Sequence, residues 1–490
     1  SLAAEAFEQY VRRSKPGQTV TLSVVRTGGD PGAAVPTPGE RRAARTLEVV
    51  LDSRARWMGP IAFEGDRSGR GDFETLLSGR ESKVTDLLRQ RAEEQGLAAP
   101  TGQLADLLGK TLESKLGANQ LSRVAAGFAH PYRAHLLAGV VTDPMREVSR
   151  EPALALREAA ANLDTAAPAL VAFEPTDTPT AAATQLAATL DRAADRLDAA
   201  FVDFAPGFRV RLRHDLIPLL DHTAKVRFVH SADDPEPMLR AMRASMFMDR
   251  AALLAAAGEA AGLIDAQWPE SFAADAEPIE VPRELRDHVT GDVLAVARTE
   301  AGVVVVGASG ENEYDMAALA GVIDVGGDDV YRYDDSASPA APVRVIVDLA
   351  GDDRHESRGG WFGPGAAMLG ISLLIDHAGD DRYEADEGGT VAAGIMGVGM
   401  IVDRAGADEY TGHAWSLGCG LYGAGMIIDL GRQHDRYEAA VLSQGIGGPG
   451  GFGLILDDGG RELYRMNGPV RSAYGTPAVY VAFGQAMGFG

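Results

Sequence analysis

The chain has almost no cysteine: Cys419 is the single one in 490 residues. One cysteine excludes an intrachain disulfide framework and a zinc site built from paired cysteines. Cys419 stands among small and apolar residues in LGCGLYGAG, which predicts a packed structural thiol rather than a nucleophile. Low cysteine use fits a bacterial envelope protein as well as a cytosolic one.

Positive charge is also scarce, since 46 Lys and Arg face 70 Asp and Glu, for a formal charge of −24. Such a chain repels phosphate backbones, so we expect no nucleic acid partner. The acidity favours solubility, cation binding or a basic partner, and a solvated acidic surface is its simplest explanation. No apolar run is long enough to span a bilayer, so we expect no transmembrane segment in this chain. The chain begins at Ser1 without Met, so a signal peptide would lie upstream.

Familiar catalytic motifs are missing as well. The sequence contains no G-x-S-x-G, no Walker loop, no Rossmann glycine pattern opening a helix and no HExxH. This favours a non-enzymatic protein. A chain of this length exceeds one hydrophobic core, and its patterns predict a multidomain α+β fold with three regions.

The first region, residues 1–52, reads as a small α+β module. AEAFEQYVRRS predicts a helix, KPGQ a turn, and TVTLSVVR and RTLEVVL two strands. This order resembles the second half of a bacterial PDZ domain, which implies a partial PDZ-like module. The family's carboxylate-binding loop would precede the helix, upstream of Ser1, so the resemblance assigns no peptide capture to residues 1–52. A small α+β cap is the alternative.

The second region, residues 61–299, reads as an all-α domain. Apolar residues recur at helical spacing, as at Leu186, Leu190 and Leu197, and helix-start signals stand at Ser82 and Thr101. Glycine and proline separate these segments. We expect a helical bundle or stacked hairpins.

The third region, residues 303–490, is a repeat array. An apolar run ends in a leading aspartate, a Gly-Asp-Asp-like turn follows, and an aromatic residue stands seven or eight positions after the aspartate. The leading aspartates are Asp324, Asp348, Asp376, Asp403, Asp429 and Asp457. The aromatic residues are Tyr331, His355, Tyr383, Tyr410, Tyr437 and Tyr464, and Tyr314 ends a degenerate earlier copy. Repeats of about 27 residues with glycine-rich connections predict a β-solenoid.

Stacked coils would place the six leading aspartates in one ladder about 4.8 Å apart, where they repel one another. Three devices relieve the repulsion. The carboxylates accept N–H groups of their own turns, or they hold calcium between coils, or Arg354, Arg382 and Arg436 neutralise the neighbouring Asp353, Asp381 and Asp435. The turns resemble calcium-binding nonapeptides of RTX toxins only in part, because those repeat every nine residues. Turn aspartates and calcium sites therefore both stay open.

Side chains between the motifs are candidates for chemistry. The tyrosine ladder serves packing and register, or else binds carbohydrate. His413 and Ser416 replace the small residues of other copies and are candidates for a hydrolytic site, with edge-loop residues as the alternative. Paired acids such as Asp380 and Asp381 recur from copy to copy, in three of the six, which favours an architectural role over acid–base catalysis.

The array as a whole resembles glycine-rich GDD-Y repeat proteins of bacterial envelopes. With the missing motifs, it predicts a periplasmic or extracellular, non-enzymatic binding or scaffold protein, with an acidic solenoid surface and a protein or polysaccharide ligand. The alternative is a hydrolase or lyase that acts on a polysaccharide or peptide from the solenoid flank. The last segment, VYVAFGQAMGFG, carries no charged cap, so we expect the final coil to self-associate or be covered.

Overall fold

The computed structural model describes residues 19–24, 45–50, 82–113, 130–204, 208–224, 236–269, 271–333, 342–358, 363–386, 388–440 and 442–466. Near the start of the chain, strand β1 (Thr19–Val24) pairs antiparallel with β2 (Arg45–Val50). These are the two strands predicted there. The helix and turn of the PDZ-like module lie outside the described residues, so that module stays a prediction.

Helices fill most of the described chain between residues 82 and 264. They are α4 (Lys83–Glu94), α5 (Ala98–Glu113), α7 (Ala134–Thr142), α8 (Met145–Val148), α9 (Ala155–Asn162), α10 (Pro179–Ala200), α11 (Phe208–Ala224), α12 (Glu236–Ala244), α13 (Arg250–Glu259) and α14 (Ala261–Ile264). Short 3-10 turns are η3 (Pro131–Arg133), η4 (Pro152–Leu154) and η5 (Arg283–Leu285). None of the helices in these stretches has both the length and the apolar character to cross a membrane.

The local signals explain the longest helix. α10 has Pro179 in its first turn, where a missing N–H costs nothing. Its buried side chains Leu186, Leu190 and Leu197 form one apolar stripe, as their spacing predicts. Because this stripe needs an apolar partner, α10 packs on the solenoid rather than standing free.

The C-terminal region is a β-solenoid, as predicted. Its helix-facing sheet comprises β4 (Val293–Thr299), β5 (Gly302–Gly307), β7 (Gly321–Asp324), β9 (Val343–Asp348), β12 (Ile371–Asp376), β15 (Val398–Asp403), β18 (Ala424–Asp429) and β20 (Phe452–Asp457). Its outer sheet comprises β3 (Val289–Thr290), β6 (Glu313–Asp315), β8 (Val330–Arg332), β10 (Arg354–Ser357), β13 (Arg382–Ala385), β16 (Glu409–Thr411), β19 (Arg436–Ala439) and β21 (Leu463–Met466). A short sheet of β11 (Ala367–Met368), β14 (Gly394–Ile395) and β17 (Gly420–Leu421) closes the coils.

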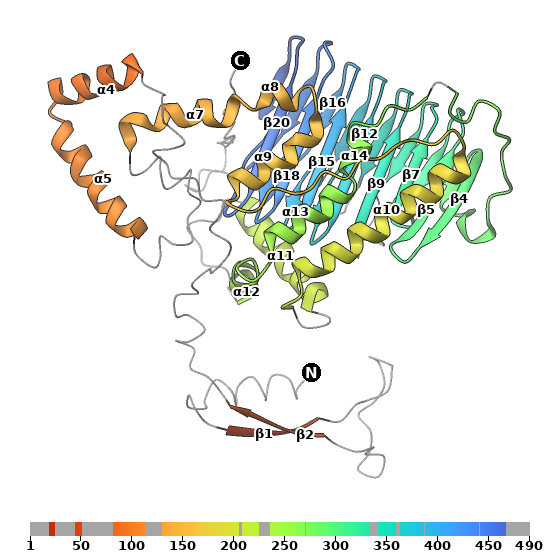
Figure 1. Ribbon diagram of the computed structural model, residues 1–490, viewed down its shortest axis with the longest axis horizontal. Helices are drawn as coiled ribbons and strands as arrows, with labels where there is room; N and C mark the ends of the chain where they lie inside the picture. Colours follow the sequence, from red (N-terminus) through yellow and green to blue (C-terminus); the bar gives the residue numbers. More distant parts are fainter. Residues whose placement is uncertain are drawn as a thin grey trace, which may run out of the picture. The chain divides into compact units, whose positions relative to one another are not determined.

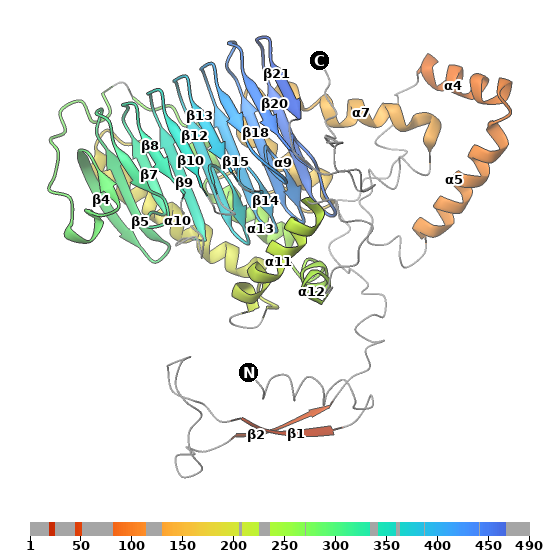
Figure 2. The ribbon, with the colours of Figure 1, turned by 180° about the vertical axis from the view of Figure 1, so that it is seen from behind.

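The helix-facing sheet is buried on both faces. Along β9, Val345 and Val347 belong to the core that also contains α10 and α13, whereas Ile346 belongs to the core inside the coils. Such double burial explains why these strands read as continuous apolar runs. Figure 1 shows α9, α10 and α13 across this sheet, and Figure 2 shows the other side, where no helix covers β8, β10 and β13.

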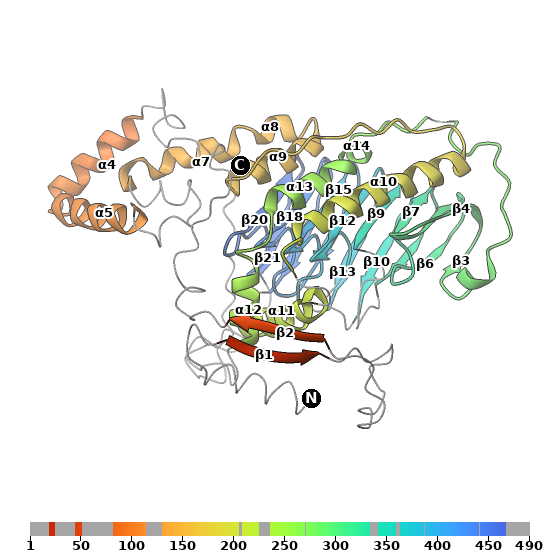
Figure 3. The same ribbon diagram turned by 60° about the horizontal axis from the view of Figure 1, so that its bottom comes forward.

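Parallel pairing keeps equivalent residues in register from coil to coil. Asp348 lies opposite Asp376, and Asp376 opposite Asp403. Close stacking demands glycine in the turns: Gly351 has φ +148°, and a Cβ there would lie 1.7 Å from the carbonyl oxygen of Gly327. Figure 3 shows β10 and β13 of the outer sheet on the side away from α10.

The start of the solenoid differs from the sequence interpretation. Strands β3 and β4 lie within residues 61–299, the range that reads as helical, and β4 pairs antiparallel with β5 across a short turn at Glu300 and Ala301. Strand β4 is apolar from Val293 to Ala297, and a β-bulge between Val293 and Ala295 places Val293 in the core inside the coils and Ala295 in the core shared with the helices. Such a strand suits a hairpin that covers the first parallel coil. The helical region packed on the solenoid spans about residues 130–265.

Candidate metal centre

The six leading aspartates end the strands of the helix-facing sheet and turn their side chains into the solenoid. In each, one carboxylate oxygen accepts the N–H two residues further on, at 2.8 to 3.3 Å. This Asx geometry is one of the devices expected from the sequence. Five of the six have no exposed surface, and Asp457 in the last described coil is half-buried.

The second oxygen of most leading aspartates accepts a tyrosine hydroxyl from the preceding coil. Tyr331 donates to Asp348 at 2.5 Å, and Tyr383 donates to Asp403 at 2.6 Å. The remaining donor–acceptor pairs are Tyr314 with Asp324, Tyr410 with Asp429, and Tyr437 with Asp457. The tyrosines from Tyr314 to Tyr437 are therefore buried and bonded to the aspartates, which favours packing and register over carbohydrate binding.

A second series of acids stands five or six residues after the leading aspartates; we call it the following acids. Its members are Asp329, Asp353, Asp381, Asp408, Asp435 and Glu462. One oxygen of each accepts the N–H of the equivalent residue in the preceding coil, for example Asp353 N–H to Asp381 at 2.7 Å. The other oxygen, Oδ2, of the five aspartates is buried without a hydrogen-bond partner in the described chain.

The two series together form a carboxylate row along the solenoid. In five places, three carboxylates bring one oxygen each within 4.8 Å of the others. These triples are Asp324–Asp329–Asp348, Asp348–Asp353–Asp376, Asp376–Asp381–Asp403, Asp408–Asp429–Asp435 and Asp435–Asp457–Glu462. The repeat pattern predicts the leading aspartates of this row as metal ligands but does not predict the following acids as ligands. Strand alternation supplies the missing signal, because each following acid stands two residues before an aromatic residue of the ladder and so points to the same side of the strand.

The environment disfavours negative charge on the aspartates of the row. Burial, and then repulsion by Asp324, raise the pKa of Asp329 to about 9. Burial, and then repulsion by Asp403, raise the pKa of Asp408 to about 10. Burial raises the pKa of Asp403 only to about 6, because the Tyr383 hydroxyl and the Ala405 N–H stabilise its charged form. Each coil therefore needs a bound proton or a cation.

The arginines do not provide that cation. Arg354 pairs with Glu356, Arg382 with Glu409 and Arg436 with Glu438, all on the exposed face of the outer sheet. The predicted Asp–Arg ladder is thus wrong. The reason is strand alternation: Arg354 follows Asp353 directly, so the two side chains point to opposite faces.

The candidates for hydrolytic chemistry lie apart from the row. Ser416 is fully buried, and its Oγ accepts the N–H of Val391 at 3.1 Å. His413 is half-buried, and its carbonyl oxygen accepts the Ser443 hydroxyl at 2.9 Å. Among the described residues no hydrogen bond joins the His413 and Ser416 side chains, so their catalytic pairing stays a prediction.

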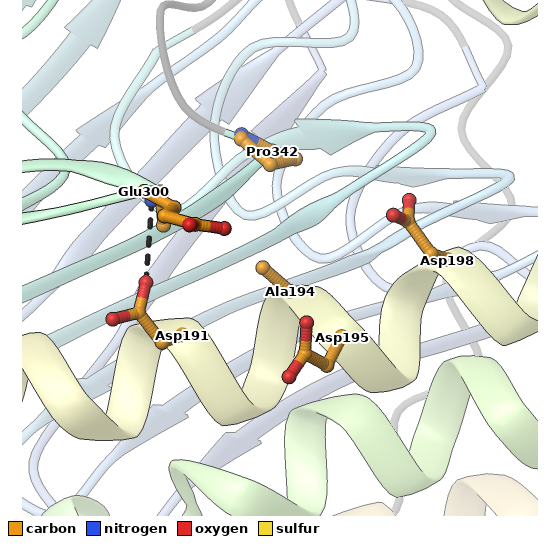
Figure 4. Close-up of a pocket in the computed structure, with 7 residues that line it drawn as sticks. Asp191, Ala194, Asp195, Asp198, Glu300 and Pro342 are labelled. Atoms are coloured by element: carbon orange, nitrogen blue, oxygen red, sulfur yellow. Dashed lines mark hydrogen bonds between the residues drawn. The ribbon is translucent and has the colours of Figure 1, made fainter.

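A second acidic feature lies between α10 and the β4–β5 turn. A cavity of about 470 Å³ is lined by Asp191, Asp195, Asp198 and Glu300 together with Ala194, Ala301 and Pro342. Figure 4 shows Asp191 reaching the turn, where it accepts the Ala301 N–H at 3.3 Å. The i, i+4, i+7 spacing of the three aspartates along α10 is the sequence signal for this face.

Comparisons with protein-family models, with curated proteins and with solved structures each found no match to this chain. Function is therefore inferred from the geometry of the site alone.

Proposed function

We propose that this protein is a non-enzymatic binding or scaffold protein whose solenoid is stiffened by calcium ions in the carboxylate row. The observation that carries the proposal is the set of five carboxylate triples, most of them with a buried oxygen that has no partner. Two oxygens bound to one calcium ion at 2.3 to 2.6 Å lie at most about 5 Å apart, which suits the spacing of the triples. An all-oxygen donor set favours hard cations.

Charge supports the same choice. A coil with one leading aspartate and one following acid carries two negative charges when both ionise, and one divalent ion balances them. No ion pair with Lys, Arg or His serves these acids in the part of the chain that the structure describes. A buried charge without a partner costs several kcal/mol, roughly, so a counter-ion adds substantial stability.

The scaffold function draws on the outer sheet. Its exposed face carries rows of paired Arg and Glu rather than a purely acidic surface, while exposed turn acids such as Asp328, Asp352 and Asp380 line one edge. Such a regular charged face suits a protein or polysaccharide ligand. A periplasmic or extracellular location is part of the proposal, because calcium is abundant there. The PDZ-like module predicted for residues 1–52 would be an accessory module of this scaffold.

Isothermal titration calorimetry tests the proposal on the full chain after dialysis against a chelator. We expect calcium to bind at several sites, in parallel with a rise of the unfolding temperature. Potassium at matched ionic strength is the control for screening. Calcium uptake below one ion per protein, without thermal stabilisation, would refute the proposal.

A further inference from the structure

Among the five carboxylate triples, the one formed by Asp435, Asp457 and Glu462 is open to solvent. The four other triples consist of buried acids alone. Here Asp435 is 2 % exposed, whereas Asp457 and Glu462 are half-buried. The turn from Asp458 to Arg461, which joins β20 to β21, is exposed at all four residues. Figure 2 shows these two strands at one end of the stack. Ions therefore reach this triple without any opening of the coils.

This triple also has the features of a cation ligand set. Asp435 Oδ1 accepts the Asp408 N–H at 2.8 Å, but Asp435 Oδ2 is buried without a hydrogen-bond partner among the described residues. Tyr437 donates to Asp457 at 2.9 Å. The Asp435 N–H donates to Glu462 at 2.8 Å. All of these donors are neutral, and no ion pair serves the three acids in the described chain. Three carboxylates thus converge within 4.8 Å of one another without a positive partner.

Glu462 distinguishes this triple chemically. It is the glutamate among the following acids, the other five being aspartates. A glutamate can bind one calcium ion through both oxygens, as in the EF-hand, and calcium takes roughly six to eight oxygen ligands. Three carboxylates therefore fill about half of that shell, and the half-exposed position of Glu462 leaves the remainder to water. Mg²⁺ fits less well, because it demands a near-ideal octahedron.

We propose that Asp435, Asp457 and Glu462 form an exchangeable calcium site, through which the solenoid responds to the calcium concentration around it. Ions in the four other triples leave only when the coils open locally, because those triples are buried. The end site loads and empties in the folded state. The division into two classes of site rests on the calcium function proposed above, whereas binding at the end site does not require ions elsewhere in the row.

Terbium luminescence tests the proposal on the full chain. Tb³⁺ replaces Ca²⁺ at oxygen sites and emits when a nearby tyrosine is excited. Tyr437 donates to Asp457, and the Tyr464 ring centroid lies 4.7 Å from that of Tyr437, so an ion at this triple lies beside sensitising rings. The folded chain is passed briefly over a chelating resin and then mixed with Tb³⁺ in a stopped-flow instrument. We expect one sensitised equivalent to bind within seconds and to be displaced by excess Ca²⁺. Emission that appears only after unfolding and refolding would overturn the proposal.

Glu462→Gln removes one charged ligand of the site. Its amide oxygen still accepts the Asp435 N–H, so the variant should fold. We expect the affinity for terbium to fall by at least about 10-fold, since affinity follows the number of charged ligands. Glu409→Gln is the matched control, because Glu409 pairs with Arg382 on the outer sheet and belongs to no triple. It should keep the affinity and the rate. Equal fast binding in Glu462→Gln and the original chain would assign the ion to other surface acids and refute the site.

A separate measurement distinguishes this result from the calcium function of the whole row. Atomic emission gives the amount of calcium that the folded chain retains after the brief resin treatment. Retained calcium without fast terbium binding would contradict the exchangeable site and leave the calcium-stiffened row intact. Fast terbium binding without retained calcium would support the end site and contradict calcium in the buried triples.

Discussion

Buried carboxylates have charged partners in the helical region and neutral partners in the solenoid. In the helical region, Asp215 accepts two hydrogen bonds from Arg240, at 2.8 and 2.9 Å, and Glu259 accepts from Arg192 and Arg196. Both acids are more than nine-tenths buried. In the solenoid, the carboxylate row is equally buried, yet its partners are hydroxyl and N–H groups without charge.

This difference shows what each region needs for stability. In the helical region, the buried acids Asp215 and Glu259 are neutralised by arginines of the chain itself. In the solenoid, the buried acids need protons or cations inside the coils to become neutral. Its stability should therefore respond to pH and to divalent ions, and that of the helical pairs should not.

The largest effect is expected from Asp403→Ala. The substitution leaves the Tyr383 hydroxyl and the Ala405 N–H buried without acceptors and removes a carboxylate from one triple. We expect a loss of roughly 3 to 5 kcal/mol in calcium, measured by denaturant unfolding. Asp380→Ala, at an exposed turn acid, is the control and should cost about 1 kcal/mol or less. Equal losses for the two variants would contradict the burial argument.

Breaking an ion pair of the helical region is the counterpart. Arg240→Ala leaves Asp215 buried without its arginine, and we expect a loss of about 3 kcal/mol. The loss should be the same with and without calcium. Arg150→Ala, in an exposed pair with Glu147, should change stability by about 0.5 kcal/mol at most. A calcium-dependent effect of Arg240→Ala would contradict the prediction that only the solenoid responds to calcium.

A smaller effect is expected from Tyr383→Phe, which removes the hydroxyl that donates to Asp403. The ring stays in its stack, so the loss is about 1 to 2 kcal/mol. Because the Asp403 carboxylate loses its neutral donor, the stability of the variant should depend more strongly on calcium than that of the original chain. Tyr464→Phe, at the exposed end of the ladder, serves as the comparison and should have little effect.

The smallest effect is expected at the outer sheet. Arg382→Ala removes an exposed pair with Glu409 at 3.7 Å, so the change should be within about 0.5 kcal/mol and vanish at high salt. A loss of several kcal/mol, measured by the same denaturant titration, would mean that Arg382 neutralises the row after all.

Much of the solenoid could be predicted from the sequence. The fixed offset between each leading aspartate and its aromatic residue predicts two ladders, and both appear in register. The partners of the ladders could not be predicted as readily. Spacing alone does not show that Tyr383 reaches Asp403 of the next coil, because this depends on how the two sheets face each other across the lumen.

Two further features could not be predicted from the sequence pattern. In the sequence, His355 is a conservative replacement of one aromatic ring by another. The structure shows its consequence: His355 has no hydroxyl, and Asp376 Oδ2 has no hydrogen-bond donor among the described residues. The helical region reads as a separate bundle, but the apolar outer side of β9 and its neighbours needs a cover, which α10 and α13 provide. The continuous apolar runs of these strands were the available signal for that cover.

Calorimetric unfolding between pH 6 and pH 9, with chelator and with calcium, tests whether exchangeable positive charge neutralises the carboxylate row. The folded pKa values of Asp329, Asp381 and Asp408, about 9, 8 and 10, lie above the unfolded value near 3.9. The folded state therefore binds more protons, and in chelator its stability should fall as pH rises toward those values.

Calcium competes with the same protons. We expect calcium to raise the unfolding temperature by an amount that grows from pH 6 to pH 9. An unfolding temperature that is independent of both pH and calcium over this range would contradict it.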